Sequence, residues 1–191
     1  MAVLNPAARQ ETASAIIEAL RKKGFKAYVV GGAVRDMLLK RRPKDHDILT
    51  NALSDQVLSL FGEDQARVVG QTFPVCLVRG VEVCTSRAGS GPGSVFPEND
   101  LAMRDFTINA MAFDPGSNTL VDPFGGRRDL ERGMIRFTGD ARDRILEDPV
   151  RMIRACRFVA LLNARLDKAG LEAVAAHAPF LDRTVAGERI R

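Results

Sequence analysis

A short apolar strand that ends in two glycines, followed by a second strand with two aspartates, constrains the fold of this chain most. The apolar run 27–30 predicts a strand, Gly31-Gly32 a sharp turn and 32–39 a short helix. The segment 45–49 predicts the second strand. A tight turn and two acidic side chains therefore follow each other closely along the chain.

The glycine pair gives a ligand direct access to the backbone. Because Gly31 and Gly32 have no Cβ, the chain can turn sharply there and expose its N–H groups. The helix that starts near Ala33 directs its positive dipole end to the same corner. A triphosphate fits such a corner, although glycine pairs after strands more often form ordinary turns.

Asp45 and Asp47 are two residues apart in the second predicted strand. Since strand side chains alternate, both carboxylates leave one face and His46 leaves the other. Mg²⁺ takes one or two carboxylates and completes its shell with phosphates. Two such ions about 3.5–4 Å apart would clamp the oxygens of an in-line phosphoryl displacement. An Asp-x-Asp pair alone is more often a solvated strand end, but its position after the glycine turn favours a metal-bound triphosphate.

A third carboxylate belongs to the same hypothesis. Glu82 lies in the predicted strand 81–85, which could flank the strand of the aspartates. There it would help to hold the metals, so we name it as a candidate catalytic residue. The alternative is an edge-strand side chain that points to water.

Length and composition fit one core with a smaller appended unit. The chain has 191 residues, of which 46% are hydrophobic and 27% charged. We expect no membrane span, and a cytoplasmic location, because residues 1–6 lack the features of a secretory signal. Three cysteines and two histidines lack the spacing of a zinc site.

Basic residues gather at particular places. The net charge is +4, and clusters stand before the aspartate pair, after a second glycine pair and in the C-terminal third. Such clusters suit a polyanionic substrate, although any one of them could be a solvated face. Aromatic residues make up only 6%, so platforms for stacking bases are sparse.

Further elements follow from periodicity and turn residues. We expect helices over 7–22, 54–61 (with Ser54 as the cap) and 105–110, strands over 66–69, 74–78 and 81–85, extended segments over 111–114, 120–121 and 133–137, and a Gly/Ser/Pro-rich loop over 86–100. After Gly139 helices replace strands, which places a domain boundary there.

The segment 147–158 carries a second polar cluster. On a helix, Glu147, Asp148, Arg151 and Arg154 share one face if the helix begins early enough. Asp148 and Arg151 could then recognise a base, because cytosine and adenine both present an amino donor beside a ring-nitrogen acceptor. The structural alternative makes Asp148 a helix cap, with Pro149 as the first helical residue.

Several motifs occur in one order along the chain: Gly31-Gly32 with Arg35-Asp36, Asp45-x-Asp47, Glu82-Val83-Cys84-Thr85-x-Arg87, Arg104-Asp105-Phe106-Thr107-Ile108-Asn109-Ala110, Glu147-Asp148-x-x-Arg151, Arg154-Ala155-x-Arg157-Phe158 and Glu188-Arg189-Ile190-Arg191. In these motifs the chain resembles the head and neck of the class II tRNA nucleotidyltransferases, the CCA-adding enzymes, and their relatives the bacterial poly(A) polymerases.

The resemblance implies an α+β fold. It implies a polymerase beta-like nucleotidyltransferase head over 1–138, with a mixed five-stranded sheet and flanking helices. An all-helical neck would follow over 139–191, and the chain would stop before the body and tail domains of its relatives.

The resemblance also implies residue roles. Asp45 and Asp47 would hold two catalytic Mg²⁺ ions. The nucleotide-binding residues would be Gly31, Gly32, Arg35, Arg104, Asp105, Asn109, Asp148, Arg151, Arg154 and Arg157.

The implied reaction is attack of an RNA 3′-hydroxyl on the α-phosphate of CTP or ATP, with pyrophosphate leaving. The expected partners are CTP, ATP and the 3′ end of tRNA or another RNA. The short loop 86–100 resembles enzymes that add only two cytidines, so CC and CCA addition both stay open. The segment 68–75 resembles the CCA-adding form more than poly(A) polymerases, which tend to carry a basic pair after its glycine.

Other functions stay open beside this one. They are a poly(A) polymerase, a non-catalytic RNA-binding module and a magnesium-dependent phosphohydrolase. The intact pair Asp45 and Asp47 speaks against the binding module, and a hydrolase would not need the Glu-Asp-x-x-Arg motif. The sequence predicts no oligomeric state.

Overall fold

The chain folds into two compact units. Its structure is a computed structural model that describes residues 6–70, 75–86 and 95–181. One unit contains the chain up to Leu101 together with 111–121, and the other contains 102–110 together with the chain from Asp122 onward. Parts of the segments 68–75 and 86–100, with Arg87 and 188–191, lie outside the described residues. The predicted domains 1–138 and 139–191 stay a prediction.

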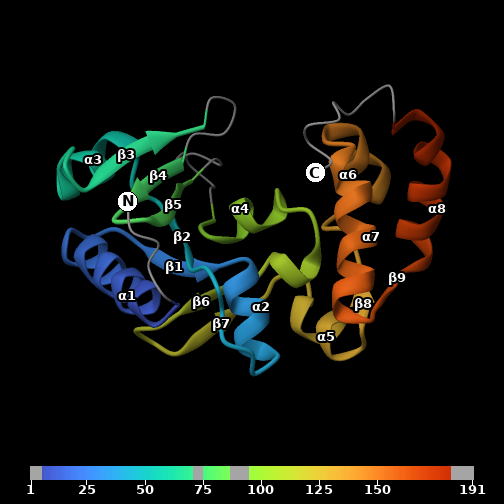
Figure 1. The fold of residues 1–191 in the computed structure, drawn as a ribbon, viewed down its shortest axis with the longest axis horizontal. Helices are drawn as coiled ribbons and strands as arrows, with labels where there is room; N and C mark the ends of the chain where they lie inside the picture. The colour runs from blue at the N-terminus through green and yellow to red at the C-terminus, as the bar shows by residue number, and fades with distance from the viewer. Residues whose placement is uncertain (1–5, 71–74, 87–94, 182–191) are drawn as a thin grey trace. The chain divides into compact units, whose positions relative to one another are not determined.

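A mixed sheet of seven strands forms the centre of the first unit (Figure 1). Its order is β3-β4-β5-β2-β1-β6-β7, and β2 runs parallel to β5 while the other neighbours are antiparallel. The strands are β1 (Ala27–Val30), β2 (Asp47–Thr50), β3 (Ala66–Val69), β4 (Val75–Val78), β5 (Val81–Thr85), β6 (Ala112–Asp114) and β7 (Thr119–Val121).

The predicted number of five strands was wrong. The short hairpin of β6 and β7 continues the sheet beyond β1, because Ala112 pairs with Val30. The mixed character of the sheet and the flanking helices were predicted correctly. A smaller difference concerns β2, which begins at Asp47, so that Asp45 precedes the strand.

Helices cover this sheet and supply its core. They are α1 (Pro6–Lys22), α2 (Gly32–Leu38) and α3 (Ser54–Phe61), whereas the short α4 (Glu98–Ala102) supplies no residue to this core. Figure 1 shows α1 running beside β1, and the buried side chains of Ile16 and Leu20 join Ile48 and Val83 of the sheet in one apolar cluster. Burial of this stripe fixes α1 against the strands.

Local details of these helices differ from the prediction. Ser54 is the first residue of α3 rather than its cap, because the Gln56 side chain accepts a hydrogen bond from the Leu53 N–H at 2.8 Å. The residues 98–100, predicted as loop, begin α4.

The second unit is built mainly from helices. Its elements are a 3₁₀ helix η1 (Thr107–Asn109), α5 (Gly126–Glu131), β8 (Met134–Ile135), α6 (Ala141–Glu147), α7 (Val150–Leu162), β9 (Arg165–Leu166), α8 (Lys168–His177) and η2 (Ala178–Phe180). Its core includes Phe106, whose ring centroid lies 4.9 Å from that of Phe137 and 5.5 Å from that of Phe158. Within the predicted helix 105–110, the structure forms only the single 3₁₀ turn η1.

The region after residue 139 is not all-helical. Asn163 adopts a left-handed conformation with φ 48° and ends α7. The chain then runs parallel to β8, where the Arg165 N–H donates to the Gly133 carbonyl at 2.9 Å. Tertiary pairing of two residues thus produces β9, which no local pattern indicates.

None of the helices in the described segments is both long enough and apolar enough to cross a bilayer.

Candidate active site

The glycine turn connects β1 to α2. Gly31 has φ 70° and ψ −135°, a conformation that residues with a Cβ rarely adopt. A Cβ at Gly32 would lie 3.4 Å from a terminal nitrogen of Arg35, in ordinary contact with this guanidinium. Arg35 is buried and donates to Asp36 Oδ1 from Nε at 3.1 Å and from Nη2 at 2.9 Å. The structure thus brings Arg35 back over the glycine turn.

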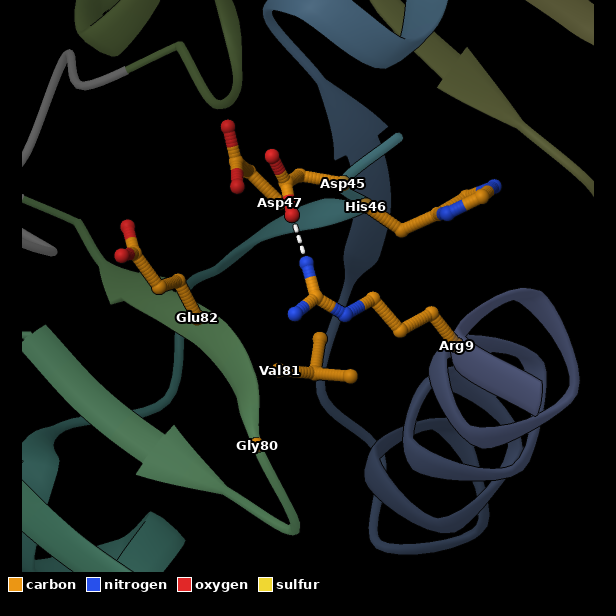
Figure 2. Close-up of a pocket in the computed structure, with 7 residues that line it drawn as sticks. All are labelled: Arg9, Asp45, His46, Asp47, Gly80, Val81 and Glu82. Atoms are coloured by element: carbon orange, nitrogen blue, oxygen red, sulfur yellow. Dashed lines mark ion pairs between the residues drawn. The ribbon is translucent and has the colours of Figure 1, made fainter. Parts of the chain in front are cut away.

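The two aspartates lie at the start of β2. Register pairs Asp47 with Val30, so the aspartates and the glycine turn are found at the same end of two neighbouring strands. Figure 2 shows the side chains of Asp45 and Asp47 on one side and His46 pointing to the other, as strand alternation predicts. The Asp45 side chain is 67% exposed.

A cavity of about 450 Å³ opens beside these carboxylates. Glu82 of β5 lines it together with Asp45 and Asp47. The cause is the parallel pairing of Ile48 with Val83, since it places Asp47 and Glu82 one residue earlier on adjacent strands. The structure therefore brings the predicted third carboxylate to the aspartate pair.

One residue of this cavity was missed by the sequence analysis. Arg9 of α1 lines the cavity, and its Nη1 forms an ion pair with Asp45 Oδ1. The same nitrogen lies 3.5 Å from the Lys44 carbonyl oxygen. Arg9 sits in a polar stretch of the helix without any motif, so no local signal marks it.

His46 lies on the opposite side of its strand end and is only 7% exposed. Burial lowers the pKa of His46, and the positive charge of Arg9 lowers it further. The ring is therefore neutral at neutral pH. Its buried Nδ1 has no hydrogen-bond partner among the residues that the structure describes.

The carboxylates fit a hard divalent cation. Within the described residues, no group of three or more His, Cys, Asp or Glu side chains is close enough to hold a metal ion. Asp45 and Asp47 nevertheless offer the one or two carboxylates that Mg²⁺ takes from a protein when phosphates complete its shell. The donor set is consistent with a metal that binds together with a triphosphate.

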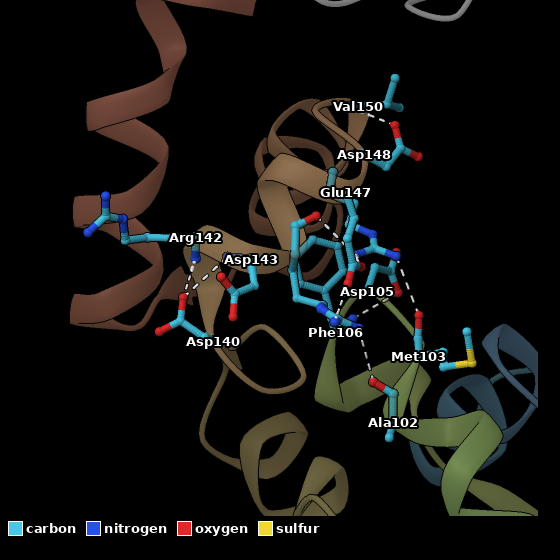
Figure 3. A network of polar contacts seen from close by, with 12 residues as sticks. Ala102, Met103, Asp105, Phe106, Asp140, Arg142, Asp143, Glu147, Asp148 and Val150 are labelled. Atoms are coloured by element: carbon cyan, nitrogen blue, oxygen red, sulfur yellow. Dashed lines mark hydrogen bonds and ion pairs between the residues drawn. The ribbon is translucent and has the colours of Figure 1, made fainter. Parts of the chain in front are cut away.

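A second group of predicted residues lies in the second unit, where α6 gives way to α7. Helix α7 begins at Val150 with Pro149 as its cap residue, so Pro149 is not the first helical residue. Asp148 occupies the break, and its Oδ1 accepts a hydrogen bond from the Val150 N–H at 3.3 Å (Figure 3). Asp148 thus caps the start of the helix from one position earlier than predicted.

Glu147 links two arginines at this break. It forms ion pairs with Arg144 and with Arg151, the latter at 2.7 Å between Oε2 and Nη1. Arg151 Nη1 also donates to the Arg144 carbonyl at 2.9 Å, and the Arg151 side chain is only 15% exposed. These contacts hold the guanidinium of Arg151 in one orientation. Asp148 directly follows Glu147 in the chain.

Asp105 is the centre of a neighbouring network of hydrogen bonds. Its Oδ2 accepts from Arg154, with Nε at 2.7 Å and Nη2 at 2.6 Å. Its Oδ1 accepts from the Phe106 N–H at 2.8 Å and from Asn109 Nδ2 at 3.1 Å. The structure therefore joins three predicted residues, Asp105, Asn109 and Arg154, in one hydrogen-bonded group.

The remaining two predicted residues have simpler surroundings. Arg104 is half-buried directly before Asp105. Arg157 is exposed on α7, with its guanidinium carbon 5.6 Å from the ring centroid of Phe158.

The comparison with protein families decides the classification. The sequence model of the Poly A polymerase head domain matches residues 27–136. The chain belongs to this family. The resemblance noted from the motifs is confirmed, and the matched segment contains the glycine turn, Asp45, Asp47, Glu82 and Asp105.

Curated relatives of this family carry two kinds of name. Poly(A) polymerase I of Haemophilus influenzae is 39% identical over 189 residues, covering 87% of this chain and 42% of the relative. The CC-adding tRNA nucleotidyltransferase of Halalkalibacterium halodurans is 43% identical over 178 residues, covering 92% of this chain and 45% of the relative. One relative is thus a poly(A) polymerase by name and the other a tRNA nucleotidyltransferase.

A solved structure of a CCA-adding enzyme is also similar to this chain. The crystal structure of the Bacillus stearothermophilus CCA-adding enzyme in complex with CTP has a TM-score of 0.81 and 38% sequence identity, over 98% of this chain and 47% of that chain. The chain thus spans less than half the length of each of these three relatives.

Proposed function

We propose that this chain is the catalytic part of a template-independent RNA nucleotidyltransferase that adds C nucleotides, A nucleotides or both to the 3′ end of tRNA. One observation carries the proposal: the pairing of Val30 with Asp47 puts the Gly31-Gly32 turn and the aspartate pair at the same end of neighbouring strands. A site that binds a triphosphate and its metal needs this juxtaposition.

Each group in the first unit has a task in this reaction. Gly31, Gly32 and Arg35 bind the triphosphate through backbone N–H groups and a guanidinium. Asp45 and Asp47 hold Mg²⁺, which when bound supplies charge neutralisation for the displacement. The RNA 3′-hydroxyl loses its proton to solvent and its oxygen forms a bond to the α-phosphorus. The bond from the α-phosphorus to the oxygen that bridges to the β-phosphate breaks, and pyrophosphate leaves. Glu82 adds a further carboxylate at the same cavity.

The second unit supplies base selection in this proposal. Asp148 accepts a hydrogen bond from the exocyclic amino group of cytosine or adenine, and Arg151 donates to the adjacent ring nitrogen. Uracil and guanine present the opposite arrangement and leave buried polar groups unpaired. The contacts of Arg151 with Glu147 and the Arg144 carbonyl support this role, because they orient the guanidinium before a base arrives.

The remaining nucleotide contacts have supporting tasks. Arg104, Asp105 and Asn109 serve the ribose and phosphate region. Arg154 acts on that region through its ion pair with Asp105, and Arg157 contributes positive charge beside it on α7.

Poly(A) polymerase is the second candidate function, because poly(A) polymerase I of Haemophilus influenzae is 39% identical to this chain. The similarity to a CC-adding enzyme likewise keeps addition of two cytidines open. These three activities differ in the nucleotide used and in the number added, so product length separates them.

The test uses the full chain with Mg²⁺, tRNA that lacks its 3′ terminal nucleotides, and each labelled NTP in turn. Addition of two C residues with no A when ATP is supplied after CTP indicates a CC-adding enzyme. A further single A indicates CCA addition, and long A tracts on any RNA indicate a poly(A) polymerase. Free phosphate without extension would indicate a hydrolase, and RNA retention without either would indicate a binding module.

Substitutions connect the activity to the site. Asp45→Asn and Asp47→Asn should reduce extension by at least about 10²-fold, because each removes a charged metal ligand. Asp55→Asn on the exposed side of α3 makes the same chemical change away from the cavity and should leave extension unchanged. Equal extension in all three variants would refute the proposal.

A further inference from the structure

Arg9 reaches the carboxylate that the proposed function assigns to a metal. Figure 2 shows its side chain extending from α1 into the cavity, with the guanidinium directed at Asp45. The ion pair joins Arg9 Nη1 to Asp45 Oδ1. A positive charge thus occupies one side of the Asp45 carboxylate.

The other contacts of Arg9 are weak. Its Nη1 lies 3.5 Å from the Lys44 carbonyl, at the limit of a hydrogen bond. Its Nε is buried and has no hydrogen-bond partner within the described ranges. An unsatisfied buried donor is unfavourable, so the ion pair with Asp45 is the main attraction that keeps the side chain in this position.

The charges around the cavity favour a cation at this place. Three carboxylates line it, those of Asp45, Asp47 and Glu82. Arg9 is the one guanidinium or ammonium among the described residues that line the cavity. Its single charge leaves an excess of negative charge that a divalent ion would neutralise more fully.

We propose that Arg9 is the counter-cation of Asp45 in the metal-free protein, and that it withdraws from this carboxylate when a divalent metal ion binds. Arg9 and the metal then compete for the same oxygen atoms. The exposure of Asp45 gives an ion access to this carboxylate from solvent. The inference rests on the proposed function, because it takes Asp45 as a metal ligand.

Competition predicts that loss of the charge at Arg9 strengthens metal binding. Mn²⁺ binding to the full chain, measured by electron paramagnetic resonance without nucleotide, should become about two- to fivefold tighter in Arg9→Gln, the range expected for an exposed ion pair. Arg9→Lys keeps the charge and should stay near the wild-type affinity.

A matched control removes general charge effects. Lys22 lies on the same helix and forms an exposed ion pair with Glu18 at 2.8 Å. Lys22→Gln removes the same charge from α1 without touching the cavity, so its Mn²⁺ affinity should equal that of the wild type. Tighter binding in both variants would mean that only the net charge matters, and would overturn the inference.

A second measurement needs no destabilising variant. In the wild-type protein the Nε–H resonance of Arg9, assigned by its loss in Arg9→Lys, should shift when Mg²⁺ is added. A resonance that does not move at saturating Mg²⁺ would contradict the withdrawal of Arg9.

The outcomes separate this inference from the proposed function. If Asp45→Asn weakens Mn²⁺ binding while Arg9→Gln leaves it unchanged or weakens it, the metal site stands and the role of Arg9 falls. If Asp45→Asn and Asp47→Asn leave Mn²⁺ binding unchanged, the metal site itself is wrong and both proposals fall.

Discussion

Arg21 of α1 and Asp114 of β6 form an ion pair, with Arg21 Nη2 and Asp114 Oδ1 2.5 Å apart. The same Arg21 nitrogen donates to the Ala27 carbonyl at 2.8 Å. Asp114 Oδ1 also accepts from the backbone N–H of Gly116 at 2.8 Å and of Ser117 at 3.2 Å. This junction ties α1, the helix that carries Arg9, to two strands of the sheet.

The junction predicts that stability depends on pH in the acid range. Burial raises the pKa of Asp114, but the hydrogen bonds from Arg21, Ser117 and Gly116 outweigh it and lower the pKa below its ordinary value. A carboxyl group with a lowered folded-state pKa stabilises the protein above its unfolded pKa, and this contribution is lost as the pH falls through the folded pKa.

Asp114→Asn should therefore cost about 1–2 kcal/mol of unfolding free energy at pH 7, because charged hydrogen bonds are lost. The difference from the wild type should shrink as the pH falls below about 4. Urea unfolding at pH 7 and at a pH below about 4 measures this difference in unfolding free energy. The exposed Asp55→Asn variant is the control. A difference that stays constant with pH would rule out ionisation of Asp114 as its source.

The glycine turn allows strain to be separated from nucleotide binding. Gly31 and Gly24 both have positive φ, 70° and 83°, and no atom lies within 4 Å of a Cβ built at Gly24. Alanine at either position should destabilise the protein by roughly 1–2 kcal/mol. Under the proposed function only Gly31→Ala should weaken CTP binding, measured by isothermal titration calorimetry with Mg²⁺. Equal CTP affinity in both variants would mean that the glycine turn does not bind the nucleotide.

Base selection should depend on Arg151 more than on the residue that orients it. Arg151→Ala should lower the preference for CTP over UTP by about tenfold or more, because a charged hydrogen-bond donor is lost. Glu147→Gln should have a smaller effect, since Arg151 keeps its hydrogen bond to the Arg144 carbonyl. Ratios of kcat/KM for the two nucleotides measure both effects. A larger effect of Glu147→Gln than of Arg151→Ala would assign base selection to Glu147.

Local chemistry explains what the sequence predicted well. Positive φ at Gly31 and side-chain alternation across Asp45, His46 and Asp47 depend on neighbours in the chain, and both occur in the structure. The interpretation of Asp148 as the cap places the start of α7 one residue too early, because helix ends differ by single hydrogen bonds. The roles of these residues in catalysis stay predictions.

Non-local pairing explains what the sequence analysis missed. The predicted extended segment 111–114 does form β6, but its place beside β1 depends on pairing with that distant strand. The strand β9 has only two residues, too few for a periodic signal, and forms because β8 pairs with it. Arg9 meets Asp45 because buried residues such as Ile16 and Leu20 pack α1 on the sheet. No pattern around Arg9 itself contains that information.

The ion pair between Arg154 and Asp105 should be important for stability. Asp105 is buried, so Arg154→Ala leaves its carboxylate, among the described residues, with the hydrogen bonds from Phe106 and Asn109. We expect a loss of about 1.5–3 kcal/mol in unfolding free energy, measured by urea unfolding. Arg157→Ala is the matched control, since Arg157 lies on the same helix over the same Phe158 ring but is exposed, and it should change stability by less than about 0.5 kcal/mol. Equal losses of unfolding free energy in the two variants would mean that contact with the Phe158 ring, and not the buried carboxylate of Asp105, determines the loss.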